Sequence, residues 1–228
     1  IKKRIPTVAR RFLESFSEKV KKAHEELTTV IDGVDSFVKY IHAVTRQHEA
    51  LPELQRLADV IKGFQQLASE QGVFINNDEI SEYQELIPIF DEVKRSLAFS
   101  SEQKATLTPK YTSSLEKSIA QLHSAVLDAT ELANDDRLSN IKTKPNRAAT
   151  LLVVIIAKTD EIRTLAQNYN YYQSSMNLTV TKFDDVDSLV NDVFYKQLLW
   201  ETKTEWMTMT KNWFQQTFKS IDPSALSG

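Results

Sequence analysis

Apolar side chains recur three and four positions apart along almost the whole 228-residue chain, and this spacing indicates helices with one apolar face. The pattern predicts helices over about residues 7–29, 34–70, 78–132, 146–174 and 185–218. The apolar positions of the first two are Val8, Phe12, Phe16, Val20 and Leu27, then Val34, Phe37, Ile41, Val44, Leu54, Leu57 and Ile61. We therefore expect an all-α protein, an elongated bundle of long antiparallel helices with coiled-coil-like heptad packing.

Glycine and aspartate mark the expected helix ends. Gly33 is expected to close the first helix in the left-handed conformation that glycine accepts easily. Residues 71–78 form the clearest linker, and Asp78 is the expected N-cap of the helix that follows. A loop is expected over 134–146 and an extended connector over 178–183, where β-branched residues favour extension.

Three prolines fall inside the predicted helices. A proline removes one backbone donor and clashes with the preceding turn. Pro52 therefore predicts a kink or a short break, and Pro88 predicts a bend. The Thr108-Pro109 pair predicts an interruption near residues 100–109.

The last two helices have apolar side chains at heptad spacing. In the helix over 146–174 these are Ala148, Ile155, Ile162 and Tyr169, and in the last helix Val186, Val193, Trp200, Met207 and Phe214, with Leu199, Trp206 and Trp213 beside them. All three tryptophans of the chain lie on this last helix. Burying one tryptophan removes ~150–250 Å² from water, an upper bound of about 4–6 kcal/mol.

Two interpretations of these aromatic residues stay open. They form the core of the bundle, or they form a docking face for the rest of a larger protein. The candidate docking residues are Trp200, Trp206, Met207, Trp213, Phe214 and Phe218.

Composition argues against a compact α/β enzyme. Four glycines and six prolines leave few tight turns, and the absence of cysteine excludes disulfides and thiolate sites. A net charge of −3 provides no bulk attraction to nucleic acid, so no nucleic-acid partner is expected. The longest apolar run, 151–157, is far shorter than the roughly 20 residues that span a bilayer, so no membrane partner is expected either.

The sequence contains no recognisable catalytic motif. The phosphate-binding pattern G-x-x-x-x-G-K-[ST] is absent, and His24, His42, His48 and His123 do not have the spacing of metal ligands. Carboxylate pairs such as Glu25-Glu26 are typical of a solvated helix surface. We expect no catalytic residue, no cofactor and no metal in this segment; an enzyme is a hypothesis without positive support.

One block of the last helix resembles a known family. The residues are Lys196-Gln197-Leu198-Leu199-Trp200-Glu201, then Trp206, Trp213 and Thr217-Phe218-Lys219-Ser220-Ile221-Asp222. This pattern is similar to the region of dynein heavy chains where the tail passes into the linker, although many members have proline where this chain has Thr217. The helix over 158–172 and the connector Val180-Thr181-Lys182-Phe183-Asp184 are also similar to it. Residues 145–224 carry the specific likeness, residues 30–133 match only in helix order and in Leu51-Pro52-Glu53-Leu54, and axonemal members are the closer ones.

The resemblance implies a non-catalytic structural segment of a motor heavy chain. Such a segment joins the tail, which binds cargo or the axoneme, to the linker, and it transmits force from the ATPase ring during ciliary, microtubule-based motility. Residues 1–30 would be the basic helix at the end of the tail, 31–133 a long-helix bundle, and 134–228 the helical pair that begins the linker.

The implied partners are the remainder of the same heavy chain, with its linker and motor ring, and dynein light chains, intermediate chains or other heavy chains. The implied location is the cytoskeleton, in the ciliary axoneme. The first residue is Ile1 and the last is Gly228, so we expect a piece of a longer polypeptide, with a processed mature protein as the alternative. The alternative function is a free-standing helical scaffold or tethering rod, similar to spectrin, that binds partner helices.

Overall fold

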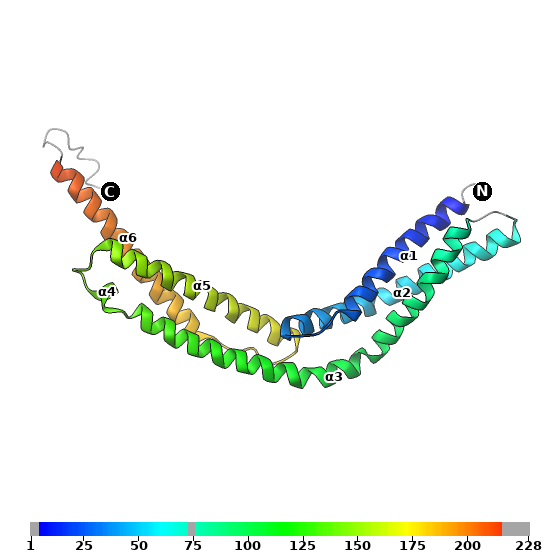
Figure 1. Ribbon diagram of the computed structural model, residues 1–228, viewed down its shortest axis with the longest axis horizontal. Coiled ribbons are helices and arrows are strands. Elements are labelled where there is room, and N and C mark those ends of the chain that lie inside the picture. The colour runs from blue at the N-terminus through cyan, green and yellow to red at the C-terminus, as the bar shows by residue number, and fades with distance from the viewer. Residues whose placement is uncertain (1–4, 73–75, 216–228) are drawn as a thin grey trace. The chain divides into compact units, whose positions relative to one another are not determined.

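The computed structural model describes residues 5–72 and 76–215, and 89% of the described chain is helical, without any strand. The helices are α1 (Ile5–Thr28), α2 (Val34–Glu70), α3 (Asn77–Ala133), α4 (Asp136–Ser139), α5 (Pro145–Ser175) and α6 (Asp184–Gln215) (Figure 1). The all-α prediction is confirmed, and the predicted helix boundaries lie within a few residues of the observed ones wherever they can be compared.

The chain divides into two compact units. The first contains residues 1–115 and 172–179, and the second contains residues 116–171 and 180–228. The three regions expected from the sequence, 1–30, 31–133 and 134–228, concern roles in a longer chain and stay a prediction.

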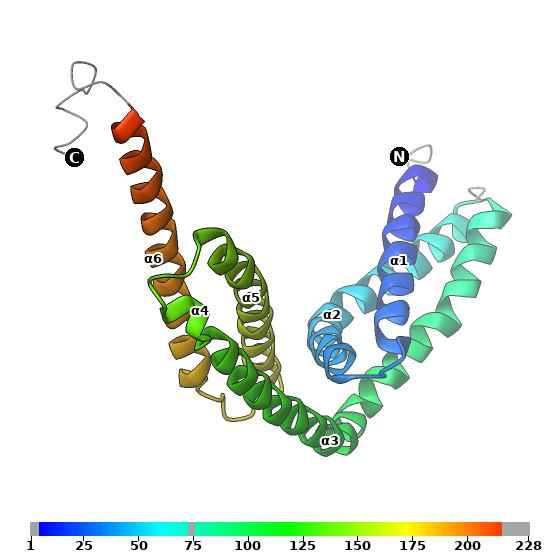
Figure 2. The same cartoon turned by 60° about the vertical axis from the view of Figure 1, so that its left-hand side comes forward.

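The first unit is a bundle of α1, α2 and the first part of α3, which lie side by side in Figures 1 and 2. Its core is centred on Phe16 of α1, whose ring centroid lies 5.4 Å from that of Phe90 and 6.2 Å from that of Tyr83. The core cluster contains Leu13, Phe16, Val20, Leu54, Leu57, Ala58, Ile61, Tyr83, Leu86 and Phe90. Burial of these apolar surfaces is the main stabilising contribution in this unit.

In the first unit, α2 and α3 run in opposite directions. Tyr83 Oη donates to the carbonyl of Ala58 over 3.1 Å, and Tyr40 Oη donates to the side chain of Gln103 over 2.9 Å. Positions that are later in α3 thus face positions that are earlier in α2. The antiparallel packing expected from short connections is confirmed here.

The second unit packs the last part of α3 against α5 and α6. Its core cluster contains Leu122, Val126, Ala129, Ala133, Leu138, Ala148, Leu152, Ile155, Ile162, Ala166, Phe183, Val186, Leu189, Val193 and Trp200. The heptad series of α5 is therefore buried from Ala148 to Ile162, as its spacing predicted. Residues 178–183 are the expected non-helical connector.

The segment expected as a plain loop over 134–146 contains the single turn α4. Asp135 is its N-cap, and the carboxylate of Asp135 accepts a hydrogen bond from the backbone N–H of Arg137 over 2.8 Å. An aspartate in this position satisfies a donor that a helix start leaves unpaired, so a short turn forms inside the loop.

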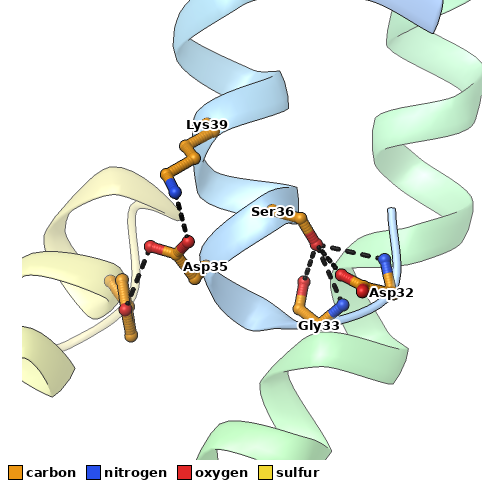
Figure 3. A network of polar contacts seen from close by, with 6 residues as sticks. Asp32, Gly33, Asp35, Ser36 and Lys39 are labelled. Atoms are coloured by element: carbon orange, nitrogen blue, oxygen red, sulfur yellow. Dashed lines mark hydrogen bonds and ion pairs between the residues drawn. The ribbon is translucent and has the colours of Figure 1, made fainter. Parts of the chain in front are cut away.

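Gly33 does not close the first helix as predicted. α1 ends at Thr28, and Gly33 is the N-cap of α2 with a φ of −154°, which is extended backbone. Figure 3 shows the reason: Ser36 Oγ accepts from the backbone N–H groups of Asp32 and Gly33 over 3.1 and 2.9 Å. The turn is stabilised by this serine, from inside the following helix.

The prediction that Asp78 is the N-cap of the next helix is also wrong. α3 begins at Asn77, and the side-chain oxygen of Asn76 accepts from the backbone N–H of Asp78 over 3.2 Å. Asn76 therefore satisfies the helix start, and Asp78 lies in the first turn, where a negative charge is favourable.

None of the three prolines ends a helix. α2 continues through Pro52, and α3 continues through Pro88 and Pro109, so the breaks expected at Pro52 and near 100–109 are absent. A proline inside a helix costs about 3 kcal/mol. Packing just after each proline offsets that cost, since Leu54, Phe90 and Tyr111 are all buried.

Two glycines, one within α2 and one just after its end, provide a matched test of backbone conformation. Gly72 has a φ of +59°, whereas Gly63 lies within the helix, and a Cβ atom added at either would meet nothing within 4 Å. We expect Gly72→Ala to lower the free energy of unfolding by about 1–2 kcal/mol, because an L-residue is strained there. Gly63→Ala should raise it by about 0.5–1 kcal/mol. Urea denaturation of both variants checks this, and equal shifts would contradict it.

Candidate functional site: the aromatic end of the last helix

The heptad series of α6 is buried along only part of its length. The buried part contains Val186, Val193 and Trp200, which are at most 4% exposed. They pack against buried side chains of α3 and α5. Met207 and Phe214 continue the same series but are 50% and 87% exposed. Figures 1 and 2 show why, since the end of α6 extends beyond α4 and beyond the first turn of α5.

Trp200 anchors α6 to the segment that follows α3. Its indole Nε1–H donates to the carbonyl of Leu138 over 3.0 Å. The ammonium of Lys203 lies 4.2 Å from the centre of the Trp200 ring and donates to the carbonyls of Ile141 and Thr143 over 2.6 and 3.3 Å. Two neighbouring side chains of α6 thus hold the α4 segment in place. Lys203 was not a predicted site residue, and no sequence motif distinguished it.

The remaining predicted docking residues lie near the end of α6. Trp206 is 58% exposed, and its ring centroid lies 6.0 Å from that of Trp213 in an edge-to-face arrangement. The core interpretation therefore applies to Trp200 and is wrong for Trp206. Phe218 lies outside the described residues, and the docking role of the whole set stays a prediction.

Two apolar grooves flank this part of α6. One, of about 420 Å³, lies between α5 and α6, is lined by Leu152, Val153, Ile156 and Trp200, and carries Glu201 and Glu205. The other, also of about 420 Å³, is lined by Leu138, Ile141, Leu199, Trp200 and Trp206, with Lys203 beside them. Grooves lined mainly by apolar side chains, with a few charges, suit a partner side chain better than chemistry on a substrate.

The Asp135–Arg137 ion pair of this region stabilises the start of α4. The guanidinium of Arg137 and its backbone N–H both bond to the carboxylate of Asp135, and they lower the pKa of Asp135 from 3.8 to about 2. Within residues 5–72 and 76–215, no cluster of three or more potential metal ligands occurs. In the same ranges, no helix has the length and apolar character needed to cross a bilayer.

The Asp135–Arg137 pair predicts a local pH dependence. Because the pKa of Asp135 is lowered in the folded chain, the cap is fully formed above pH ~4 and is lost as the pH falls through ~2. A carboxyl titration by NMR should find a midpoint near 2, and Arg137→Gln should raise it towards 3.8. Arg163→Gln, an exposed change on α5, is the control and should leave the midpoint in place.

The fold and this surface define an all-α bundle protein whose last helix extends past its partners. No family model matches the chain. It is 19% identical over 193 residues to human dynein axonemal heavy chain 6, an alignment that covers 83% of this chain and 5% of that protein. It is 20% identical over 220 residues to human dynein axonemal heavy chain 14, covering 91% of this chain and 6% of that one.

The chain is thus distantly similar, over most of its length, to axonemal dynein heavy chains. The predicted resemblance to dynein heavy chains is confirmed at that level, for the chain as a whole. The chain spans only 5% and 6% of the length of these two relatives, and its position between tail and linker is a matter for proposal.

Proposed function

We propose that this chain is a non-catalytic structural segment of an axonemal dynein heavy chain, at the junction of the tail with the linker. It carries force between the tail and a linker that an ATPase ring elsewhere in the heavy chain moves. The observation that carries the proposal is the distant similarity to two axonemal heavy chains along most of the sequence. The Lys196–Glu201 block supports the position within the heavy chain, because it resembles the block that dynein heavy chains have where the tail passes into the linker.

The packing of the second unit suits a force-bearing element. α3 and the α4 segment run parallel to α6 with one fixed register, since four contacts along them all join residues 62 positions apart. They include His123 Nδ1 at 2.6 Å from Asp185 Oδ2 and Lys196 Nζ donating to Asn134 over 3.2 Å. Sliding α6 along α3 would break all four contacts together. A segment transmits displacement only where it resists such local opening.

The proposed partners follow from this role. They are the linker and motor ring of the same heavy chain, with dynein light chains, intermediate chains or other heavy chains as further candidates. The proposed location is the ciliary axoneme. No cofactor, nucleic acid or membrane is required by the role.

The first test is the sequence of the parent polypeptide beyond residue 228. A dynein heavy chain would contain several G-x-x-x-x-G-K-[ST] motifs there. Their absence would refute the proposal and favour the free-standing scaffold instead.

The second test places Trp200→Ala in the intact heavy chain. Microtubule-stimulated ATP hydrolysis should persist while the speed of microtubule gliding falls, because the ring works but the junction yields. Leu127→Ala is the control, since Leu127 is 71% exposed on α3 of the same unit. Unchanged gliding, with loosening of α6 verified by hydrogen exchange, would contradict a force-bearing role.

A further inference from the structure

A third groove of the second unit lies between the start of α5 and the last part of α6, and we call it the basic groove. Its volume is about 730 Å³, against about 420 Å³ for each of the two grooves beside Trp200. Lys144 and Arg147 line it on the α5 side, and Met207, Lys211 and Asn212 line it on the α6 side. Among all its lining residues three are basic and none is acidic, so the charge of the lining is positive.

The three cations of the basic groove have no ionic partner in the described part of the chain. Lys144, Arg147 and Lys211 are all exposed, and within residues 5–72 and 76–215 no carboxylate lies within ion-pair distance of any of them. Arg137 of the same unit differs, because it is paired with Asp135 over 2.7 Å. The positive charges of the basic groove are therefore available to a partner.

The surroundings of the basic groove are also positive. Lys142 precedes it in the chain, and Lys203 keeps its charge because it is bonded only to neutral carbonyls. Residues 142–147 and 201–215 together contain five Lys or Arg and two Glu, a net charge of +3. The whole chain has a net charge of −3, so this end of the second unit differs in sign from the chain as a whole. Residues 216–228, which lie outside the described residues, contain one Lys and one Asp and add no net charge.

The two glutamates of this region limit the length of the positive stretch. Glu201 and Glu205 line the adjoining apolar groove and not the basic one. Glu201 precedes Lys211 by ten residues, which is about 15 Å along the helix. A negatively charged occupant is therefore attracted over a short distance and repelled beyond it. This change of sign favours a polypeptide with a short acidic segment over a nucleic acid, whose phosphates repeat without interruption.

We propose that the basic groove binds a short acidic segment of a partner polypeptide, whose carboxylates pair with Lys144, Arg147 and Lys211. Charge complementarity selects the sign of the occupant. The volume of about 730 Å³ is within the range of ligand-binding clefts, and Met207, which is 50% exposed, provides an apolar contact beside the cations. The inference does not depend on the force-bearing role, since it concerns only this groove.

The test uses the full chain and two short synthetic peptides that carry a fluorophore. One peptide alternates glutamate and serine, and the other has glutamine in place of every glutamate. Binding is measured by fluorescence anisotropy at low and at high salt. We expect the glutamate peptide to bind about tenfold more tightly at low salt, because three exposed ion pairs of ordinary strength have about that effect together. The difference should shrink at high salt, which screens exposed charges.

Two double variants locate the binding. Arg147→Gln combined with Lys211→Gln should weaken binding of the glutamate peptide about fivefold, because two of the three ion pairs are lost. Both side chains are exposed, so the circular dichroism spectrum should not change. Lys158→Gln combined with Arg163→Gln is the matched control, since it removes two exposed cations from α5 outside the groove. The control should bind the glutamate peptide as the parent chain does.

Four results would overturn the proposal. The two peptides bind equally at low salt, or the two double variants lose affinity equally, which would indicate attraction by net charge alone. A single-stranded oligonucleotide binds more tightly than the glutamate peptide and is released by the groove variant, which would make a nucleic acid the occupant. Sedimentation shows a dimer of the chain that the groove variant dissociates, which would make a second copy the occupant. A failed dynein assignment would leave the expected peptide preference intact, so the two proposals fail separately.

Discussion

Replacing Trp200 by alanine is expected to lower the free energy of unfolding of the second unit by about 3–5 kcal/mol. The indole is 4% exposed, packs into the core between α3, α5 and α6, and bonds to the carbonyl of Leu138. Its loss also removes the ring against which the ammonium of Lys203 lies. Guanidinium denaturation, combined with hydrogen exchange of α6 to assign the effect to this unit, measures the change.

Two controls separate the causes. Trp206→Ala removes the same side chain from a site that is 58% exposed and should cost less than about 1 kcal/mol. Trp200→Phe keeps most of the apolar volume but removes the bond to Leu138, so its cost should lie between the other two. Equal losses for Trp200→Ala and Trp206→Ala would show that the anchor is misassigned.

The corresponding change in the first unit is Phe16→Ala, with an expected loss of about 3–5 kcal/mol. Phe16 is fully buried, and its ring contacts the rings of Tyr83 and Phe90, so one truncation weakens the packing of α1 on α3. Hydrogen exchange should increase in α1 and around Tyr83, where the contacts are lost.

Phe99→Ala is the matched control for Phe16, because Phe99 belongs to the same unit and is 64% exposed. Its free energy of unfolding should stay within about 1 kcal/mol of that of the parent chain. A loss for Phe16→Ala that is no larger than that of the control would mean that α1 does not contribute to the core of this unit.

The helix caps show where local sequence signals are ambiguous. Gly33 and Asp78 are both suited to caps, but Gly33 is the N-cap of α2 and not the end of α1, and Asp78 lies in the first turn of α3. Which residue satisfies the unpaired amides depends on the path of the chain into the helix, and here Ser36 and Asn76 supply the acceptors. A residue two or three positions away can serve equally well, so composition alone does not select between them.

The prolines show a second kind of ambiguity, between local and tertiary energies. Pro52 and Pro109 disfavour a helix locally, so each predicts an interruption. The observed helices continue because each proline is close to buried side chains, such as Leu54 and Tyr111, whose packing outweighs one lost hydrogen bond. Propensity is a weak prior wherever packing is strong.

The sequence by itself determined the all-α class, the approximate extents of the long helices and the heptad series on α5 and α6, because helical periodicity is a local property of the chain. It also carried the resemblance to dynein heavy chains in the Lys196–Glu201 block. Only the tertiary structure decided that Trp200 is buried and Trp206 is exposed. Burial requires neighbours from distant parts of the chain, and those neighbours, α4 and α5, accompany α6 past Trp200 but not to its end.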